Sequence, residues 1–166
     1  MAMRWFGGYV PDRPGEAGWP RPPGARLLWA GQFPVWSEGP WPDSEVRVTR
    51  QAQVAVIGPC AAVDLTFAAS DAHGLAVAHA GSYTVVQASW EELRVFTDLG
   101  FAWPVYLARY GAGTAWASSA RMLAGLTGAR PDPAWLATAL IDPAAPACGA
   151  RSLSSRCWPA WAATAT

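Results

Sequence analysis

Two amino acids are missing from the 166-residue sequence: it contains no lysine and no asparagine, and all 12 cationic residues are arginines. The lack of lysine excludes Schiff-base catalysis and a phosphate-binding loop built around a lysine. The lack of asparagine excludes an Asn side chain from any oxyanion hole and removes every N-glycosylation acceptor. Because 12 acidic residues balance the arginines, the chain has no cationic field that would draw it to nucleic acid or anionic membranes. We expect neither as a partner.

Cysteine is also scarce, and Cys60, Cys148 and Cys157 have no short paired spacing. This argues against a disulfide framework and against a zinc site of the CxxC type. The apolar stretch 5–10 holds two glycines and is followed by proline, so it is too short for a signal-peptide core. The uncharged run 51–63 has 13 residues, whereas a membrane helix needs about 20 apolar residues. We expect a cytoplasmic protein.

The region 11–42 is dense in proline, glycine and tryptophan. This composition predicts irregular loops and short edge strands and makes helix improbable. Pro11–Pro14 has the spacing of a polyproline-helix ligand. Such matches arise often in proline-rich chains, so we interpret the segment as a packed loop.

From residue 46 onwards, hydrophobic periodicity predicts regular structure. The alternation at 46–48 and the apolar run 54–57 predict two strands, and the three- and four-residue spacing over 61–70 predicts a helix. Five short segments rich in Val, Tyr, Phe and Trp then predict an antiparallel series, at 75–80, 82–88, 93–97, 105–110 and 114–118. Gly111–Gly113 lacks the third glycine of a dinucleotide fingerprint and precedes a strand, so we interpret it as a hairpin turn.

Two helices are predicted after these strands. Ser118 or Ser119 is suited to cap the first, and Gly128 stops it. Asp132 caps the second, which has proline at its first position and ends at Asp142.

The residues capable of catalysis or metal binding are scattered along the sequence. His73, in a predicted turn, and His79, in a predicted strand, have no second ligand at helical or hairpin spacing, so we predict no metal site. Glu91 and Glu92 are adjacent carboxylates between strands, a pattern typical of a solvated tip. Cys60 precedes a predicted helix, whose N-terminus would lower the thiol pKa, but we favour the interpretation of a buried apolar cysteine.

Eleven tryptophans allow two interpretations, of which we favour the second, core filling. Exposed rings would form a surface that stacks on a sugar or a peptide. Alternatively, a chain with few phenylalanines and isoleucines fills its core with indoles. Burial of the rings decides between these interpretations.

Three patterns occur in order at 81–83, 97–106 and 116–123: Gly-Ser-Tyr, then Thr-Asp-Leu-Gly with Pro-Val-Tyr, then Trp-Ala-Ser-Ser-Ala-Arg-Met-Leu. They resemble the G-x-F strand, the R-D-x-x-G-x-x-P-L-Y segment and the F-A-S-E-x-K-A-L passage of the N-terminal glutaminase-like domain of asparagine synthase-related proteins. The opening from Met3 resembles the lasso-peptide macrolactam cyclases of that family and implies Met3 as the initiator. The resemblance implies an α+β fold of the N-terminal-nucleophile hydrolase type, a four-layer sandwich with two antiparallel sheets between helices.

In that family the mature chain begins with a cysteine whose thiolate attacks the glutamine amide, and Arg4 has the matching position here. A guanidinium cannot be that nucleophile. The family's Asn-Gly-Glu turn, which supplies oxyanion donors, is matched by Ile57, Gly58 and Pro59, so only the glycine is kept. Asp64 matches an aspartate that holds the glutamine amine. We therefore predict no catalytic residue, with Gly58 and Asp64 as remnants of a glutamine pocket.

The resemblance also implies a second domain that uses ATP and magnesium to activate a carboxylate, and no segment here resembles its pyrophosphate loop. We expect a catalytically inactive glutaminase-like domain over 3–142 that supports a separate ATP-binding synthetase domain or subunit, with a ribosomal precursor peptide as a further partner. The alternatives are a fragment of a glutamine-hydrolysing asparagine synthase and an aromatic-lined module that binds the precursor peptide. We expect 143–166 to be irregular or disordered, as a natural terminus or through a frameshift near residue 150.

Overall fold

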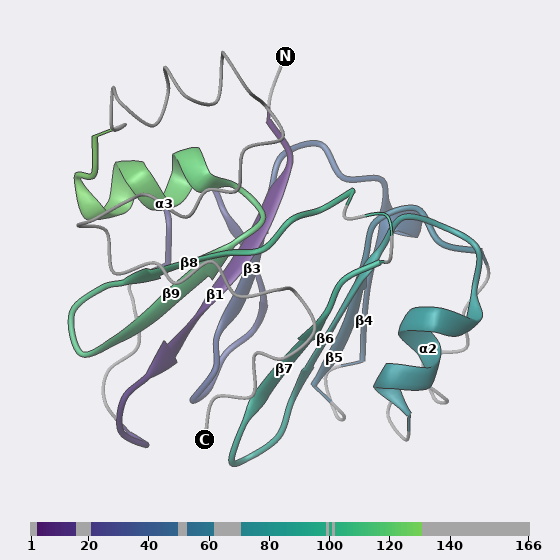
Figure 1. Ribbon diagram of the computed structural model, residues 1–166, viewed down its shortest axis with the longest axis horizontal. Coiled ribbons are helices and arrows are strands. Elements are labelled where there is room, and N and C mark those ends of the chain that lie inside the picture. The colour runs from purple at the N-terminus through teal and green to yellow at the C-terminus, as the bar shows by residue number, and fades with distance from the viewer. Residues whose placement is uncertain are drawn as a thin grey trace.

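The computed structural model describes residues 3–15, 21–49, 53–61, 71–98, 100 and 102–130. Its strands are β1 (Trp5–Pro11), β2 (Arg26–Trp29), β3 (Val35–Glu38), β4 (Val46–Thr49), β5 (Val54–Ile57), β6 (Thr84–Ala88), β7 (Leu93–Phe96), β8 (Tyr106–Arg109) and β9 (Gly113–Ala117). Its helices are α2 (Ala72–Ala78), α3 (Ala120–Thr127) and a short 3-10 helix, η1 (Asp43–Glu45). The fold is α+β, with a five-stranded sheet in the order β2-β3-β1-β9-β8 and a four-stranded sheet in the order β4-β5-β6-β7 (Figure 1). Every strand pair is antiparallel.

The two sheets pack face to face, because successive side chains of a strand point to opposite faces. Phe6 of β1 and Trp116 of β9 share one buried cluster with Ile57 of β5 and Val86 of β6. This cluster joins residues from both sheets and forms the central core. The expected pair of stacked antiparallel sheets is confirmed.

The outer face of each sheet is covered by one helix. Trp5, the neighbour of Phe6 on β1, packs with Leu123 of α3 on the outer face of the five-stranded sheet. Val56, the neighbour of Ile57 on β5, packs with Leu75 of α2 on the outer face of the four-stranded sheet. The helices therefore lie outside the sheets, as expected.

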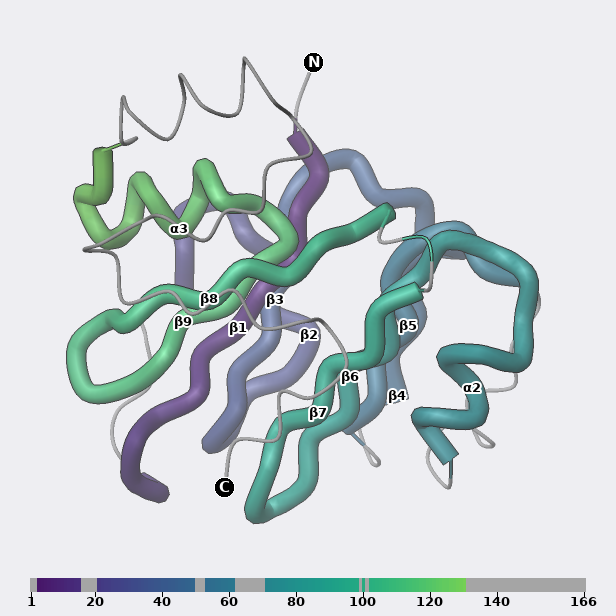
Figure 2. The backbone as a smooth tube through the Cα atoms, in the orientation of Figure 1, coloured from purple at the N-terminus to yellow at the C-terminus, as the bar shows by residue number. Residues whose placement is uncertain are grey.

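The stretch 5–10, which the sequence marked only as too short for a signal peptide, is the middle strand of its sheet. Figure 2 shows β1 running between β3 and β9. A Cβ atom at Gly7 would collide with the Trp116 carbonyl oxygen, and one at Gly8 would lie 2.5 Å from the Pro34 carbonyl oxygen. The two glycines thus allow the neighbouring segments of the same sheet to approach β1 closely. The expectation of edge strands in 11–42 holds for β2, whereas β3 is an interior strand.

The prediction of a strand over 75–80 is wrong, because residues 75–78 belong to α2 and the helix ends there. The helix begins after Asp71, whose side chain accepts a hydrogen bond from the Gly74 backbone N–H at 2.7 Å. Leu75 and Ala76 are buried against the four-stranded sheet. The Tyr83 hydroxyl donates to the Leu75 carbonyl oxygen at 2.6 Å and holds the helix to the sheet.

The remaining strand predictions are confirmed in position, with the antiparallel series divided between the sheets. The first hairpin, β6–β7, belongs to the four-stranded sheet, and the second, β8–β9, belongs to the five-stranded sheet. Gly111 lies in the β8–β9 turn with φ of 56°, as the hairpin interpretation requires. The Ser119 side chain caps α3 by accepting from the Met122 N–H at 3.3 Å, and Gly128 ends it in the left-handed region with φ of 67°.

Several predictions lie outside the described residues: the helices at 61–70 and 132–142, Asp64, and the tail 143–166. Among the helices that the structure describes, none has both the length and the apolar character needed to cross a membrane.

Candidate functional site

Arg4, which precedes β1, forms an ion pair across the sandwich with Glu45 of η1. Its Nη1 atom donates to Glu45 Oε2 at 2.6 Å, and the side chains are 35% and 21% exposed. The backbone at Gly39 packs closely against the backbone of Arg4. Gly39 has φ of 99°, and a Cβ there would lie 2.9 Å from the Arg4 Cα atom. The guanidinium is thus held at the rim of the inter-sheet core.

Two indole rings face the Arg4 guanidinium. Its central carbon lies 4.9 Å from the centroid of the Trp41 ring and 5.8 Å from that of Trp103. The two indoles are 5.1 Å apart, and each lies 6.3 Å from the Phe6 ring, which belongs to the central core. Arg4, Phe6, Trp41, Glu45 and Trp103 make up what we call the Arg4 cluster. A cation beside indole faces is stabilised by their negative quadrupole.

Gly58, a predicted remnant of the glutamine pocket, lies next to this cluster. Its N–H donates to the Glu45 carbonyl oxygen at 2.8 Å. Its φ is 117°, and a Cβ atom would collide with the Ser82 carbonyl oxygen and lie 3.2 Å from Trp103 Nε1. Only glycine fits this position. Its N–H is already bonded within the fold and is not presented to a ligand.

An open pocket of about 480 Å³ adjoins the cluster at Glu45. It lies where η1, the end of β5 and the turn before β6 meet, and its lining residues are Ser44, Glu45, Pro59, Cys60, Ala61, Ala80 and Gly81. Two of these residues, Cys60 and Gly81, are paired by an isolated antiparallel β-bridge. Cys60 and Glu45 therefore line the same pocket, which sequence spacing alone did not indicate.

The electrostatic environment of Cys60 favours the thiol over the thiolate. Burial raises the pKa of the Cys60 thiol, and the nearby Arg47 guanidinium opposes this with a smaller effect. Arg47 Nη2 donates to the Cys60 carbonyl oxygen at 3.0 Å and so is directed at the backbone. The interpretation of Cys60 as an activated nucleophile gains no support from this geometry.

Neither histidine is among the residues that line the pocket. His73 is in α2, not in a turn, and its ring centroid lies 5.7 Å from that of Phe96. His79 is the C-terminal cap residue of α2, not a strand residue. In the described ranges, no group of three His, Cys, Asp or Glu residues is arranged to hold a metal ion.

The other candidates have structural roles. Ser118 Oγ accepts from the Phe6 N–H at 3.0 Å, and Ser119 caps α3. Glu91 is exposed at the β6–β7 turn, and Glu92 pairs with Arg94. None of these side chains lines the pocket.

In the described part of the chain, the burial of the tryptophans distinguishes a stacking surface from core filling. Four indoles are buried, at Trp5, Trp29, Trp36 and Trp116. Two more lie in the Arg4 cluster and are half-buried. Trp90, at the β6–β7 turn, is 81% exposed. Core filling and packing around Arg4 therefore account for six of these rings.

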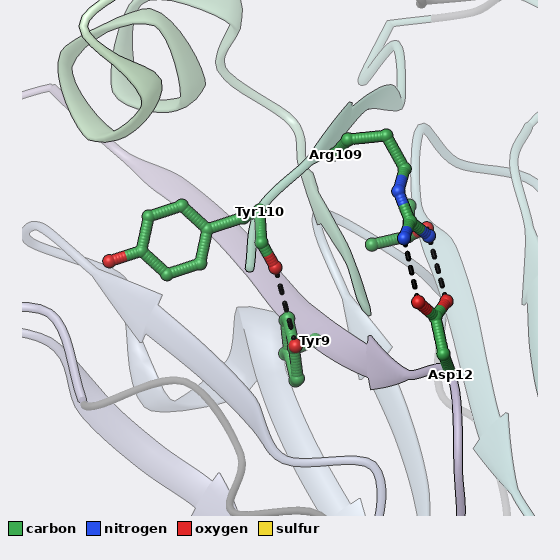
Figure 3. Close-up of polar contacts among 5 residues, drawn as sticks. Tyr9, Asp12, Arg109 and Tyr110 are labelled. Atoms are coloured by element: carbon green, nitrogen blue, oxygen red, sulfur yellow. Dashed lines mark hydrogen bonds and ion pairs between the residues drawn. The ribbon is translucent and has the colours of Figure 1, made fainter. Parts of the chain in front are cut away.

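A second polar cluster lies at the opposite end of β1 (Figure 3). Arg109 on β8 holds Asp12 through two hydrogen bonds, Nη1 to Oδ1 at 2.7 Å and Nη2 to Oδ2 at 2.6 Å. The Tyr9 hydroxyl donates to the Tyr110 carbonyl oxygen at 3.3 Å. The guanidinium lowers the pKa of Asp12. Both side chains of the ion pair are about half exposed, and the contact ties the end of β1 to β8.

Sequence analysis missed Glu45, Trp41 and Trp103. These residues belong to no common sequence motif. They lie in two segments, one ending in η1 and one between β7 and β8, which come together only when the sheets pack. The one feature of the sequence that pointed to this site was Arg4, directly before β1.

Comparison of the chain with protein-family models, with curated proteins and with solved structures found no match.

Proposed function

We propose that the chain is a catalytically inactive glutaminase-like domain of an asparagine synthase-type lasso-peptide macrolactam cyclase, with the N-terminal-nucleophile layer order. Its function is to support an ATP-dependent, amide-forming partner domain. The observation that carries this proposal is Arg4: at the position that matches the nucleophile of the family, a guanidinium is ion-paired with Glu45 and lies beside two indoles.

The surroundings of Arg4 lack the groups that glutamine hydrolysis needs. Ile57, at the position of the oxyanion asparagine, is fully buried, and its side chain has no hydrogen-bond donor. The Gly58 N–H is bonded to the Glu45 carbonyl oxygen. Loss of one oxyanion donor costs about 2.7 to 4 kcal/mol of barrier, and loss of the nucleophile removes the covalent route. These changes together support an inactive domain over an active amidotransferase.

The two sheets have a packed core between them, which is consistent with a supporting role. The core between the sheets is continuous, and each outer face is covered by a helix. In this proposal ATP and magnesium bind to the partner, and the chain contributes a folded surface. A ribosomal precursor peptide would bind the assembled pair.

The first test measures glutamine hydrolysis. We expect purified protein to release no glutamate from glutamine above a buffer control, and to form no covalent adduct with a diazo-ketone glutamine analogue by mass spectrometry. An adduct at any residue, or turnover proportional to protein concentration, would contradict the proposal.

The second test measures the supporting role. The chain is co-expressed with the ATP-binding domain of an asparagine synthase-type cyclase encoded in the same gene cluster. We expect the two to co-elute and peptide cyclisation to require both. Titration of the chain alone with fluorescently labelled precursor peptide separates the alternatives, because tight binding without the partner would favour a peptide-binding module.

A further inference from the structure

The Arg4 cluster has the composition of a receptor for a planar organic cation. Two indoles, Trp41 and Trp103, lie 4.9 and 5.8 Å from the guanidinium carbon, and the Glu45 carboxylate binds an N–H at 2.6 Å. Stacking on aromatic faces and hydrogen bonding to a carboxylate are the two interactions that a guanidinium makes best.

The walls of this cluster are held by contacts that do not involve Arg4. Trp41 Nε1 donates to the Glu38 carbonyl oxygen at 2.9 Å, and Trp103 Nε1 donates to the Ser82 carbonyl oxygen at 3.1 Å. Glu45 is fixed through its backbone, whose N–H donates to the Pro42 carbonyl oxygen at 2.9 Å. The walls should therefore keep their positions when the arginine side chain is shortened.

The site is also open to solvent. The Arg4 side chain is 35% exposed and the Glu45 side chain is 21% exposed. A small molecule can thus reach the space that the arginine fills without opening the central core.

From this geometry we propose that Trp41, Trp103 and Glu45 form a binding site for alkylguanidinium ions, and that Arg4 is its built-in occupant. The site prefers a planar cation with N–H donors. An ammonium lacks the flat face, and a neutral urea lacks the charge. The inference rests on the contacts of these residues and does not depend on the function proposed above.

The test removes the occupant and supplies it from solution. Arg4→Ala deletes the atoms beyond Cβ, and ethylguanidinium contains the same atoms. We expect ethylguanidinium to raise the thermal midpoint of Arg4→Ala saturably, by about 3 to 6 °C at ten times its Kd. Neutral ethylurea should give no saturable shift. Glu45→Gln in the Arg4→Ala background should weaken binding about tenfold.

Two controls make the result specific. The wild-type chain should not respond, because Arg4 fills the site. Arg109→Ala removes an arginine that has a carboxylate partner, Asp12, but no indole over it among the described residues, so it should not respond either. If Arg4→Ala does not fold alone, the refolding yield with ethylguanidinium should exceed that with ethylurea. The proposal is wrong if Arg4→Ala shows no saturable response, if Arg109→Ala responds equally, or if the two refolding yields are the same.

Discussion

A guanidinium carries a positive charge, so Arg4 needs an anion or aromatic faces wherever it leaves water. The structure supplies both, through Glu45 and two indoles. At the residue scale, the guanidinium that precedes β1 is therefore stabilised in place. Sequence reasoning singled out Arg4, and its lack of catalytic reactivity stays a prediction. It did not identify the partners, which come from separate loops.

Thr84 presents the opposite case, a polar group without compensation. It is fully buried on β6, and its hydroxyl has no hydrogen-bond partner in the described ranges. Thr84→Val has nearly the same shape and removes the unsatisfied group. We expect it to increase the free energy of unfolding by about 1 kcal/mol in urea titration. Thr49→Val, at a half-buried position on β4, is the control and should give no gain. A clear loss of stability in Thr84→Val would contradict this account.

The Cys60 thiol provides a test of local electrostatics. Because burial raises its pKa, the thiolate fraction at any pH below that pKa is smaller than for a free cysteine. Iodoacetamide should alkylate Cys60 more slowly in the folded chain than in urea, with the rate rising at higher pH. Peptide mass mapping distinguishes Cys60 from Cys148 and Cys157. Arg47→Gln removes the charge that lowers the pKa and should slow alkylation further; faster alkylation in this variant would contradict the assignment.

At the element scale, the sequence predicted most strands correctly because alternation, apolar runs and turn glycines act over a few residues. The prediction of a strand over 75–80 was wrong for a physical reason. Leu75 and the Ala-Val-Ala that follows it fit both the two-residue period of a strand and the 3.6-residue period of a helix, because the segment is so short. The deciding signal was Asp71, whose side chain caps the first turn of α2. The central placement of β1 depends on contacts with β3 and β9, which are distant in sequence.

The cap of α3 allows a quantitative check at this scale. Ser119→Ala removes the acceptor of the Met122 N–H and should cost about 1 kcal/mol of unfolding free energy. Ser119→Asp keeps an acceptor and should retain most of the stability. Urea denaturation followed by circular dichroism measures both. Equal stability of Ser119→Ala and the wild type would show that the cap contributes nothing.

At the scale of the whole molecule, the fold is held by one core that neither sheet possesses alone. Ile57 of β5 and Trp116 of β9 belong to the same buried cluster. The described strands of the four-stranded sheet contain no tryptophan, whereas those of the five-stranded sheet contain four. Among the described residues, the buried indoles all lie in the five-stranded sheet, and Trp90, at the β6–β7 turn, is exposed. The change in indole emission on unfolding therefore reports mainly on the five-stranded sheet, and substitutions can be placed in the other.

Ile57→Ala tests whether the two sheets unfold together. Removing buried methyl groups at a position with no exposure should lower the unfolding free energy by about 2 to 5 kcal/mol. Because the core is shared, the fluorescence midpoint of the five-stranded sheet should fall to the same urea concentration as the circular dichroism midpoint. Val77→Ala, at a site on α2 that is 59% exposed, is the matched control and should leave both midpoints nearly unchanged. A fluorescence transition that stays at its wild-type midpoint in Ile57→Ala would mean that the sheets unfold separately and that the central cluster does not couple them.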